Sequence, residues 1–348
     1  MNDTGEAQPA HEAEASSQAP RRWWARWRPG ARRAPQAPRG RWQAVARKEL
    51  ADHLGSVRFV VLLLLVLAAA TATVLSGADA LRQATGQGGP IPAFLRLYTV
   101  GGERLPSFVG LITFVLPLLG IAFGFDAVNA ERSQRTLPRL LAQPMYRDDV
   151  IIGKFVAGLI TVAVVLGALV LLTGGLGIFS LGIAPAASDV GRLVAWWAVS
   201  VVYVAVWLAL ALLCSVVVRR PATSALVPLA VWLVLSLFGT LLAGLVADVL
   251  APREGGPTAA IENVETQQAV SRIAPSTLYG QASSALLNPQ VRTFGVVLPR
   301  QTDRAVPGEL PFDQSLLLVW PHLTVLVGLV VVLFAIAAGV FLRQEVRA

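Results

Sequence analysis

Long apolar runs alternate with short polar segments along this chain of 348 residues. Six of the runs are long enough to cross a bilayer as a helix, which takes about 20 residues. A longer segment, 248–314, follows the fifth run, and we expect it to form an outer loop with short surface helices at 260–273 and 278–287. The pattern predicts an all-α polytopic membrane protein with transmembrane helices at about 57–76, 107–127, 150–172, 193–218, 225–247 and 315–342.

The polar segment 126–154, between the second and third spans, indicates the orientation. Its Arg and Lys residues outnumber its Asp and Glu residues, as is usual for a short cytoplasmic loop. Arg219 and Arg220, in the tight turn after the fourth span, belong to the same side. Six spans then place both termini in the cytoplasm, with residues 1–40, which lack a periodic apolar face, as a disordered tail. We expect a multi-pass protein of the plasma membrane.

Composition supports this environment and excludes several classes of protein. Hydrophobic residues make up 55% of the chain and charged residues 14%, whereas soluble domains carry roughly 25% charged residues. The net charge of +8 follows from the basic cytoplasmic loops, so we expect no nucleic-acid partner. The single cysteine, Cys214, excludes a disulfide or a cysteine metal cluster within one chain.

Motifs for catalysis are missing from the sequence. Gly153 and Lys154 are followed by Phe155 and lack the upstream glycine of an ATP-binding P-loop. The spans contain no pair of carboxylates, which disfavours an intramembrane protease or an ion-driven pump. His322 is expected to be an interfacial residue rather than a proton relay. We therefore expect no catalytic residue, metal site or cofactor in this chain.

The stretch before the first span is predicted to be an amphipathic helix. Its apolar residues fall on one helical stripe and its charged residues lie elsewhere. Such a helix lies half sunk in the inner leaflet, in contact with membrane lipid. The apolar stripe consists of Trp42, Val45, Ala46, Leu50 and Leu54.

A second short helix is predicted inside the polar segment. Leu137, Leu140 and Leu141 recur at the spacing of one helical face. Pro144 then ends the helix, since proline has no N–H to donate. The pattern alone leaves two interpretations open, an amphipathic connector in the headgroups or a docking helix for a soluble partner.

The same segment resembles the first cytoplasmic loop of ABC-2 type permeases, the membrane subunits of ABC exporters. That loop reads approximately E-x-x-x-G-T-L-x-x-L-L-x-x-P-x-x-R, followed by G-K, and Arg135 stands here where the family has its glycine. The residues that match are Glu131, Thr136, Leu137, Leu140, Leu141, Pro144, Arg147 and Lys154. The helix before the first span resembles the elbow helix of the same family, through Trp42, Lys48, Glu49 and Leu50. The turn around Ser215, Arg219 and Arg220 is similar to that of the NosY-like branch.

The resemblance implies a permease domain at 41–348 that forms the translocation path of an ATP-driven export system. The segment 126–154 would carry the coupling helix, which docks a separate P-loop ATPase that binds ATP and Mg. A second permease copy, or a paralogue, would complete the path. The alternative is a scaffold or mechanotransmission subunit of an ATPase-linked complex that transports nothing. A membrane enzyme is a more distant third interpretation.

Overall fold

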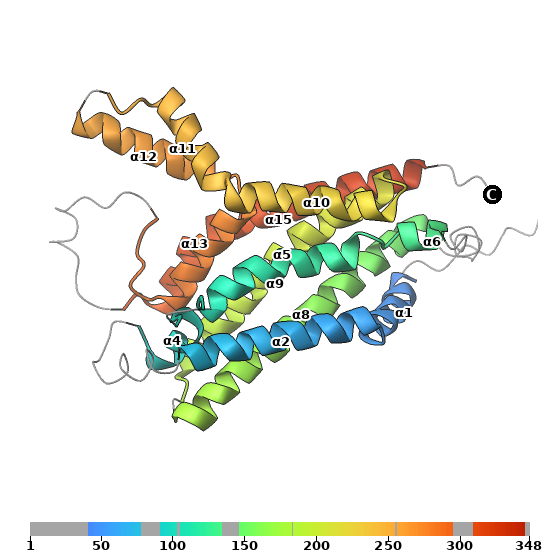
Figure 1. Cartoon of the computed structure of the whole chain (residues 1–348), viewed down its shortest axis with the longest axis horizontal. Helices are drawn as coiled ribbons and strands as arrows, with labels where there is room; N and C mark the ends of the chain where they lie inside the picture. The colour runs from blue at the N-terminus through green and yellow to red at the C-terminus, as the bar shows by residue number, and fades with distance from the viewer. Residues whose placement is uncertain are drawn as a thin grey trace, which may run out of the picture. The chain divides into compact units, whose positions relative to one another are not determined.

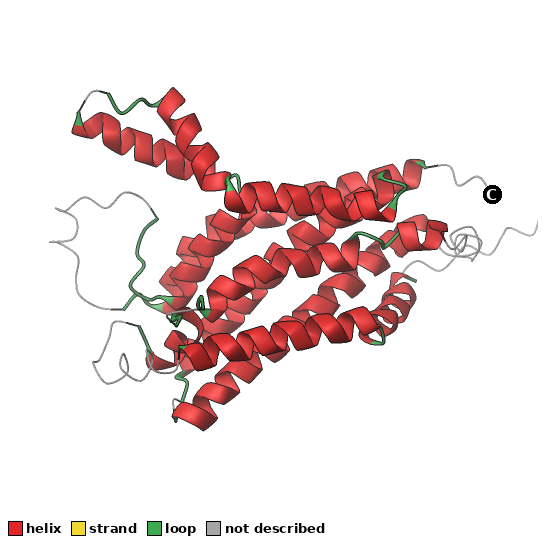
Figure 2. Cartoon of the chain, viewed as in Figure 1, coloured by secondary structure: helices red, strands yellow, loops and turns green. Residues whose placement is uncertain are grey.

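The computed structural model describes residues 41–77, 91–102, 105–133, 146–182, 184–254, 256–294 and 309–344. All regular structure in these ranges is helical, and no strand occurs in them (Figures 1 and 2). The all-α prediction is confirmed for this part of the chain. The predicted tail, 1–40, lies outside the described residues.

Five helices in the described part are long and apolar enough to cross a membrane. Predicted and observed positions agree for all five, although the third and fourth are longer than their apolar cores. Helical structure continues there into residues that hydropathy alone does not assign to a span. The five are α2 (Val57–Ser76), α5 (Phe108–Gly124), α8 (Arg147–Leu181), α9 (Ala187–Val217) and α15 (Phe312–Arg343).

The predicted fifth span is broken rather than continuous. It consists of α10 (Pro221–Leu237) and α11 (Gly239–Leu250), which meet at an angle of 61°. The break falls at Phe238 and Gly239, and glycine is a poor helix former. Because the apolar run continues unchanged through the break, hydropathy gave no sign of it. Counting the bent pair as one crossing gives six spans, as predicted.

Both helices expected in the outer loop are present, as α12 (Pro257–Ser271) and α13 (Pro275–Leu287). In the first, Asn263 donates to the Asp248 carboxylate at 3.0 Å and to the Ala251 carbonyl at 2.8 Å, which closes a hairpin with α11 (Figure 1). The second helix was expected to lie at the surface, and this prediction is wrong. Its Tyr279 is fully buried, because α13 packs between α9 and α15.

Helix α9 is the centre of the helical core. It packs against α5, α8, α10, α13 and α15. Its large aromatic residues, Trp196, Tyr203 and Trp207, are fully buried. A short helix that hydropathy did not reveal, α4 (Ala93–Thr99), is anchored to α8 by the Tyr98 hydroxyl, which donates to the Val170 carbonyl at 2.9 Å. The core is thus built around one buried helix.

Helices α5 and α9 approach so closely at Gly120 that no side chain fits there. A Cβ at this position would lie 2.9 Å from the Val204 carbonyl oxygen and 3.1 Å from the Leu208 amide nitrogen. Because both neighbours are backbone atoms, Gly120→Val should lower the free energy of unfolding by about 1–3 kcal/mol. Gly175→Val on α8, where nothing lies within 4 Å of the added Cβ, is the control, and chemical denaturation in detergent compares the two. Equal stability of the variants would contradict the close packing.

Candidate functional site

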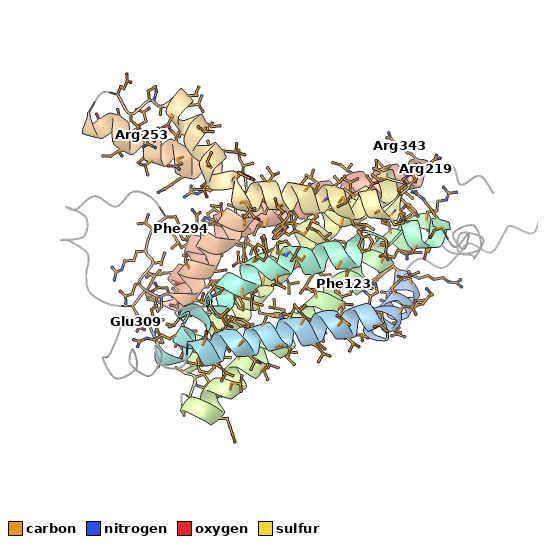
Figure 3. The ribbon with its side chains drawn as sticks, viewed as in Figure 1. Phe123, Arg219, Arg253, Phe294, Glu309 and Arg343 are labelled. Carbon is orange, nitrogen blue, oxygen red and sulfur yellow. The ribbon has the colours of Figure 1, made fainter. Side chains whose placement is uncertain are left out.

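Several helix ends meet at one end of the bundle. Helix α1 (Trp42–Leu54), α6 (Asn129–Ser133) and the C-terminal end of α15 lie there in Figure 1. Arg219 and Arg343 are at this same end in Figure 3, whereas Phe294 and Glu309 are at the other. The described parts of the two family-like segments, in α1 and in α6, therefore belong to one region.

A buried lysine of α8 joins this helix to α1 and α6. The Lys154 ammonium on α8 lies 3.0 Å from Glu49 Oε1 on α1 and 2.8 Å from Glu131 Oε1 on α6. The lysine side chain is only 4% exposed, and the two glutamates are 13% and 15% exposed. A charge withdrawn from water is costly unless it is paired, and here the lysine is paired with two carboxylates. We call this cluster the Lys154 triad.

The triad is supported by close packing of α1 against α8. A Cβ on Gly153 would lie 2.6 Å from Val45 Cβ and 2.9 Å from the Trp42 carbonyl oxygen. Glycine is therefore required at this crossing, next to the lysine of the triad. Val45 and Ala46 are buried, which places part of the predicted apolar stripe against protein rather than lipid.

A second set of contacts ties the same region to α9 and α15. The guanidinium of Arg132 donates to the Val216 carbonyl at 3.0 Å and also contacts the Gln344 side chain. Gln344 donates to the same carbonyl at 3.0 Å, and its own carbonyl accepts from Arg147 at 3.0 Å. These contacts, which we call the second network, connect α6, α8 and the ends of α9 and α15 to one another.

Ser215 completes the junction between α6 and α9. Its hydroxyl oxygen accepts from the backbone amides of Val128 and Asn129 at 3.0 and 3.2 Å. Amides at a helix start have no partner within the helix, and here a residue of another helix satisfies them. Ser215 was noticed in the sequence only through the family-like turn, and the structure shows what it contacts.

The structure brings some of the predicted site residues together and leaves others apart. The structure brings together Glu49, Glu131 and Lys154, and places Arg147 in the neighbouring network. Lys48 points outward and forms an exposed pair with Asp52 at 3.0 Å. Trp42 and Leu50 are half-buried on α1. Outside the described residues lie Thr136, Leu137, Leu140, Leu141 and Pro144, so the docking helix itself stays a prediction.

Sequence reasoning missed a buried arginine at the other end of the bundle. Arg192 on α9 donates to the Leu286 carbonyl and to the Ser315 hydroxyl, each at 3.0 Å, and also contacts the Leu310 carbonyl. It thereby fixes the end of α13 and the start of α15. Hydropathy gave no sign of this role, because Arg192 precedes the apolar run of the predicted span.

His322 has contacts that the sequence did not indicate. It is buried, and its Nε2 lies 2.9 Å from Gln281 Oε1 on α13. The ring of Phe294 meets it edge-on, with centroids 4.7 Å apart. Hydropathy could not foresee this contact, because it depends on α13 folding back into the bundle. In the part of the chain that the structure describes, no three His, Cys, Asp or Glu side chains gather as a metal site.

Comparisons with known proteins give a consistent result. A family model described as ABC-2 family transporter protein matches residues 43–346. The chain is 33% identical over 123 residues to a protein of Stutzerimonas stutzeri described as a probable ABC transporter permease protein NosY, a match that covers 35% of this chain and 40% of that protein. It is 32% identical over 111 residues to the protein of the same description from Pseudomonas aeruginosa, with 32% and 36% covered. The chain thus spans well under half the length of these relatives.

Proposed function

Because the chain belongs to the ABC-2 family of transporter proteins, and is a membrane permease subunit of that family, we propose that it forms the translocation path of an ATP-driven exporter. A separate P-loop ATPase binds ATP and Mg and docks on the segment 126–154. The permease domain comprises residues 41–348, in the plasma membrane, with both termini in the cytoplasm. A second copy, or a paralogue, forms the other half of the path.

The observation that carries this proposal is the Lys154 triad. The predicted docking residues, within 134–145, are connected directly to α6 on one side and α8 on the other. Lys154 binds a carboxylate of α6 and one of α1 while it is itself part of α8. A force applied to the docking segment therefore acts on three helices together, rather than bending a loose loop.

The second network extends this path into the bundle. Arg132 and Arg147 contact the ends of α9 and α15, and α9 packs against α13 near the other end. Movement of α6 and α8 is thus transmitted to the helix at the centre of the core. In transport by alternating access, the path opens to one side of the membrane at a time. Such transport requires this connection, because closure of the ATPases must open a path far from the nucleotide.

Purification of the tagged full-length protein from its native host in mild detergent tests the proposal. We expect a soluble subunit with a P-loop to co-purify in stoichiometric amount and to give the complex ATPase activity. Recovery of the permease without an ATPase would contradict the docking assignment. A complex that hydrolyses ATP but moves no compound extracted from the host across reconstituted vesicles would favour the scaffold alternative.

A further inference from the structure

A cavity lies between α4, α8 and α9, in the half of the bundle away from the Lys154 triad. Its volume is about 410 Å³, within the range of roughly 300–1,000 Å³ that is usual for small-molecule sites. Helix α8 packs against both α4 and α9 (Figure 1) and lines the cavity from Gly167 to Ile178. The described residues of this lining belong neither to the triad nor to the second network.

Glycines of α8 leave this space open. Gly167, Gly174 and Gly175 all line the cavity. A Cβ on Gly175 would meet nothing within 4 Å, and one on Gly167 would lie at an ordinary contact distance, 3.5 Å, from Trp197 Nε1. Gly174 is different, because a Cβ there would lie 2.9 Å from the Tyr98 hydroxyl oxygen. The cavity therefore exists because α8 lacks a side chain at two positions that have room for one.

The lining favours an apolar occupant over water. Its described residues are aliphatic or aromatic, and the two ring donors among them are already used. The Tyr98 hydroxyl donates to the Val170 carbonyl at 2.9 Å, and Trp197 Nε1 donates to the Ala163 carbonyl at 3.1 Å. A buried water needs two to four polar partners, which these side chains do not supply.

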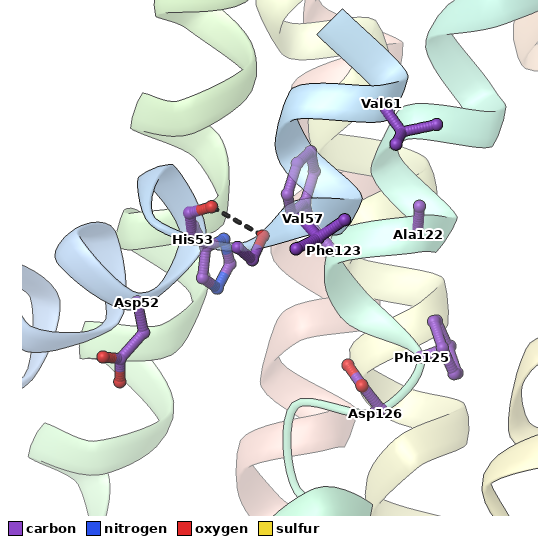
Figure 4. Close-up of a pocket in the computed structure, with 9 residues that line it drawn as sticks. Asp52, His53, Val57, Val61, Ala122, Phe123, Phe125 and Asp126 are labelled. Carbon is purple, nitrogen blue, oxygen red and sulfur yellow. Dashed lines mark hydrogen bonds between the residues drawn. The ribbon is translucent and has the colours of Figure 1, made fainter.

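A larger cavity at the corner of α1, α2 and the end of α5 has a different character (Figure 4). Its volume is about 730 Å³, and its lining includes Asp52, His53 and Asp126. Carboxylate and imidazole groups hydrogen-bond to water, so that cavity can be hydrated. The apolar lining is thus a particular property of the cavity beside α4.

The cavity is continuous with the lipid-facing surface of two spans. Leu171 of α8 and Val194 of α9 are part of its lining and are 77% and 58% exposed at the surface of the chain. Both helices are long and apolar enough to cross a membrane. An acyl chain of the surrounding bilayer therefore meets the opening of the cavity directly.

The length of the cavity also fits an acyl chain. The lining on α8 extends from Gly167 to Ile178, which is about 16 Å of helix at 1.5 Å per residue. The hydrocarbon of one leaflet is about 15 Å thick, half of a core of roughly 30 Å. The cavity thus extends over the depth of a single leaflet.

We propose that this cavity binds one acyl chain of a phospholipid from the leaflet on its side, the outer leaflet in the orientation proposed above. The chain lies along Gly167 and Gly175 and against the rings of Phe94 and Tyr98. Lipid tails are as apolar as the lining, so the hydrophobic effect does not favour the cavity over the bilayer. Binding comes instead from dispersion contacts that the walls of an unfilled cavity lack. The bound chain thereby fills the junction between α4 and the bundle.

A photoactivatable lipid tests the proposal. The purified full-length chain is placed in phosphatidylcholine vesicles with a trace of phosphatidylcholine that carries a diazirine in one acyl chain, and mass spectrometry locates the label after irradiation. We expect label on Phe94 and Tyr98 of α4, which are only 5% and 1% exposed and which a chain reaches by entering the cavity. Label at Leu65 of α2, which is 60% exposed, is the reference for ordinary contact with lipid.

Two variants fill the cavity. Gly167→Leu and Gly175→Leu each place a side chain in the open space, and each should lower the label on α4, relative to that on α2, by about tenfold, which corresponds to about 1.4 kcal/mol. Gly328→Leu adds the same side chain to α15, where nothing lies within 4 Å of the added Cβ. It is the matched control and should leave the label on α4 unchanged. Thermal unfolding verifies that each variant is folded.

Two results would overturn the proposal. One is a labelled α2 with an unlabelled α4 in the original protein, and the other is an unchanged label on α4 in both folded filling variants. In the first case, a disulfide between two chains through Leu171→Cys would assign the cavity to a second copy instead. None of these measurements requires an ATPase or transport, so their failure leaves the proposed function untouched.

Discussion

Lys154→Met should lower the free energy of unfolding by about 3–5 kcal/mol, the usual cost of removing one partner from a buried ion pair. The substitution keeps most of the side-chain volume but leaves Glu49 and Glu131 without their shared cation. Both carboxylates then stay largely withdrawn from water, and close enough to repel each other. Denaturation in detergent, followed by circular dichroism, measures the loss.

Two further variants separate the charge from other effects of this substitution. Lys48→Met removes a lysine of helix α1 whose side chain is 60% exposed and lies 3.4 Å from the same Glu49, and it should cost no more than about 1 kcal/mol. The triple variant Lys154→Met, Glu49→Gln, Glu131→Gln removes all three charges, and replacing a whole buried pair is often neutral. It should therefore recover most of the stability. Equal losses for Lys154→Met and Lys48→Met would show that the triad does not stabilise the fold.

Hydropathy predicted the spans well because membrane insertion depends on local composition. The first span was expected at about 57–76, and α2 covers Val57–Ser76. A helix of apolar residues satisfies its own backbone, so a lipid environment fixes its extent without reference to the rest of the chain. The bend at Gly239 was missed for the same reason. It changes the direction of a helix without changing its hydropathy.

The contacts of the candidate site could be predicted only in part. The sequence singled out Glu49, Glu131 and Lys154 as separate family-like positions, but Glu49 and Lys154 are 105 residues apart. No periodicity connects residues at such a separation, so their ion pair becomes visible only when α1 packs on α8. Arg132 and Gln344 are a harder case, because neither belongs to a motif and their contact depends on the ends of two distant helices.

Replacement of Leu140 and Leu141 by Asp should abolish co-purification of the ATPase. The spacing of Leu137, Leu140 and Leu141 predicts one apolar face on a short helix, and we propose that this face docks in the partner. Apolar anchors at the centre of an interface each contribute about 2 kcal/mol or more. A carboxylate at the same place must also be buried without a partner, which adds a desolvation cost. Two such changes together exceed what a typical transient interface can lose.

Ala142→Asp provides the matched control. It introduces the same carboxylate one residue further along, on the opposite side of the predicted helix, and should leave co-purification intact. Both variants should unfold at the same temperature as the original protein, because a docking face exposed in the permease alone contributes little to its stability. Loss of the ATPase only in the leucine variant would locate the docking face. Retention of the ATPase in both variants would leave the leucines as an amphipathic connector in the headgroups, and the contact with the ATPase would then have to lie elsewhere on the cytoplasmic end.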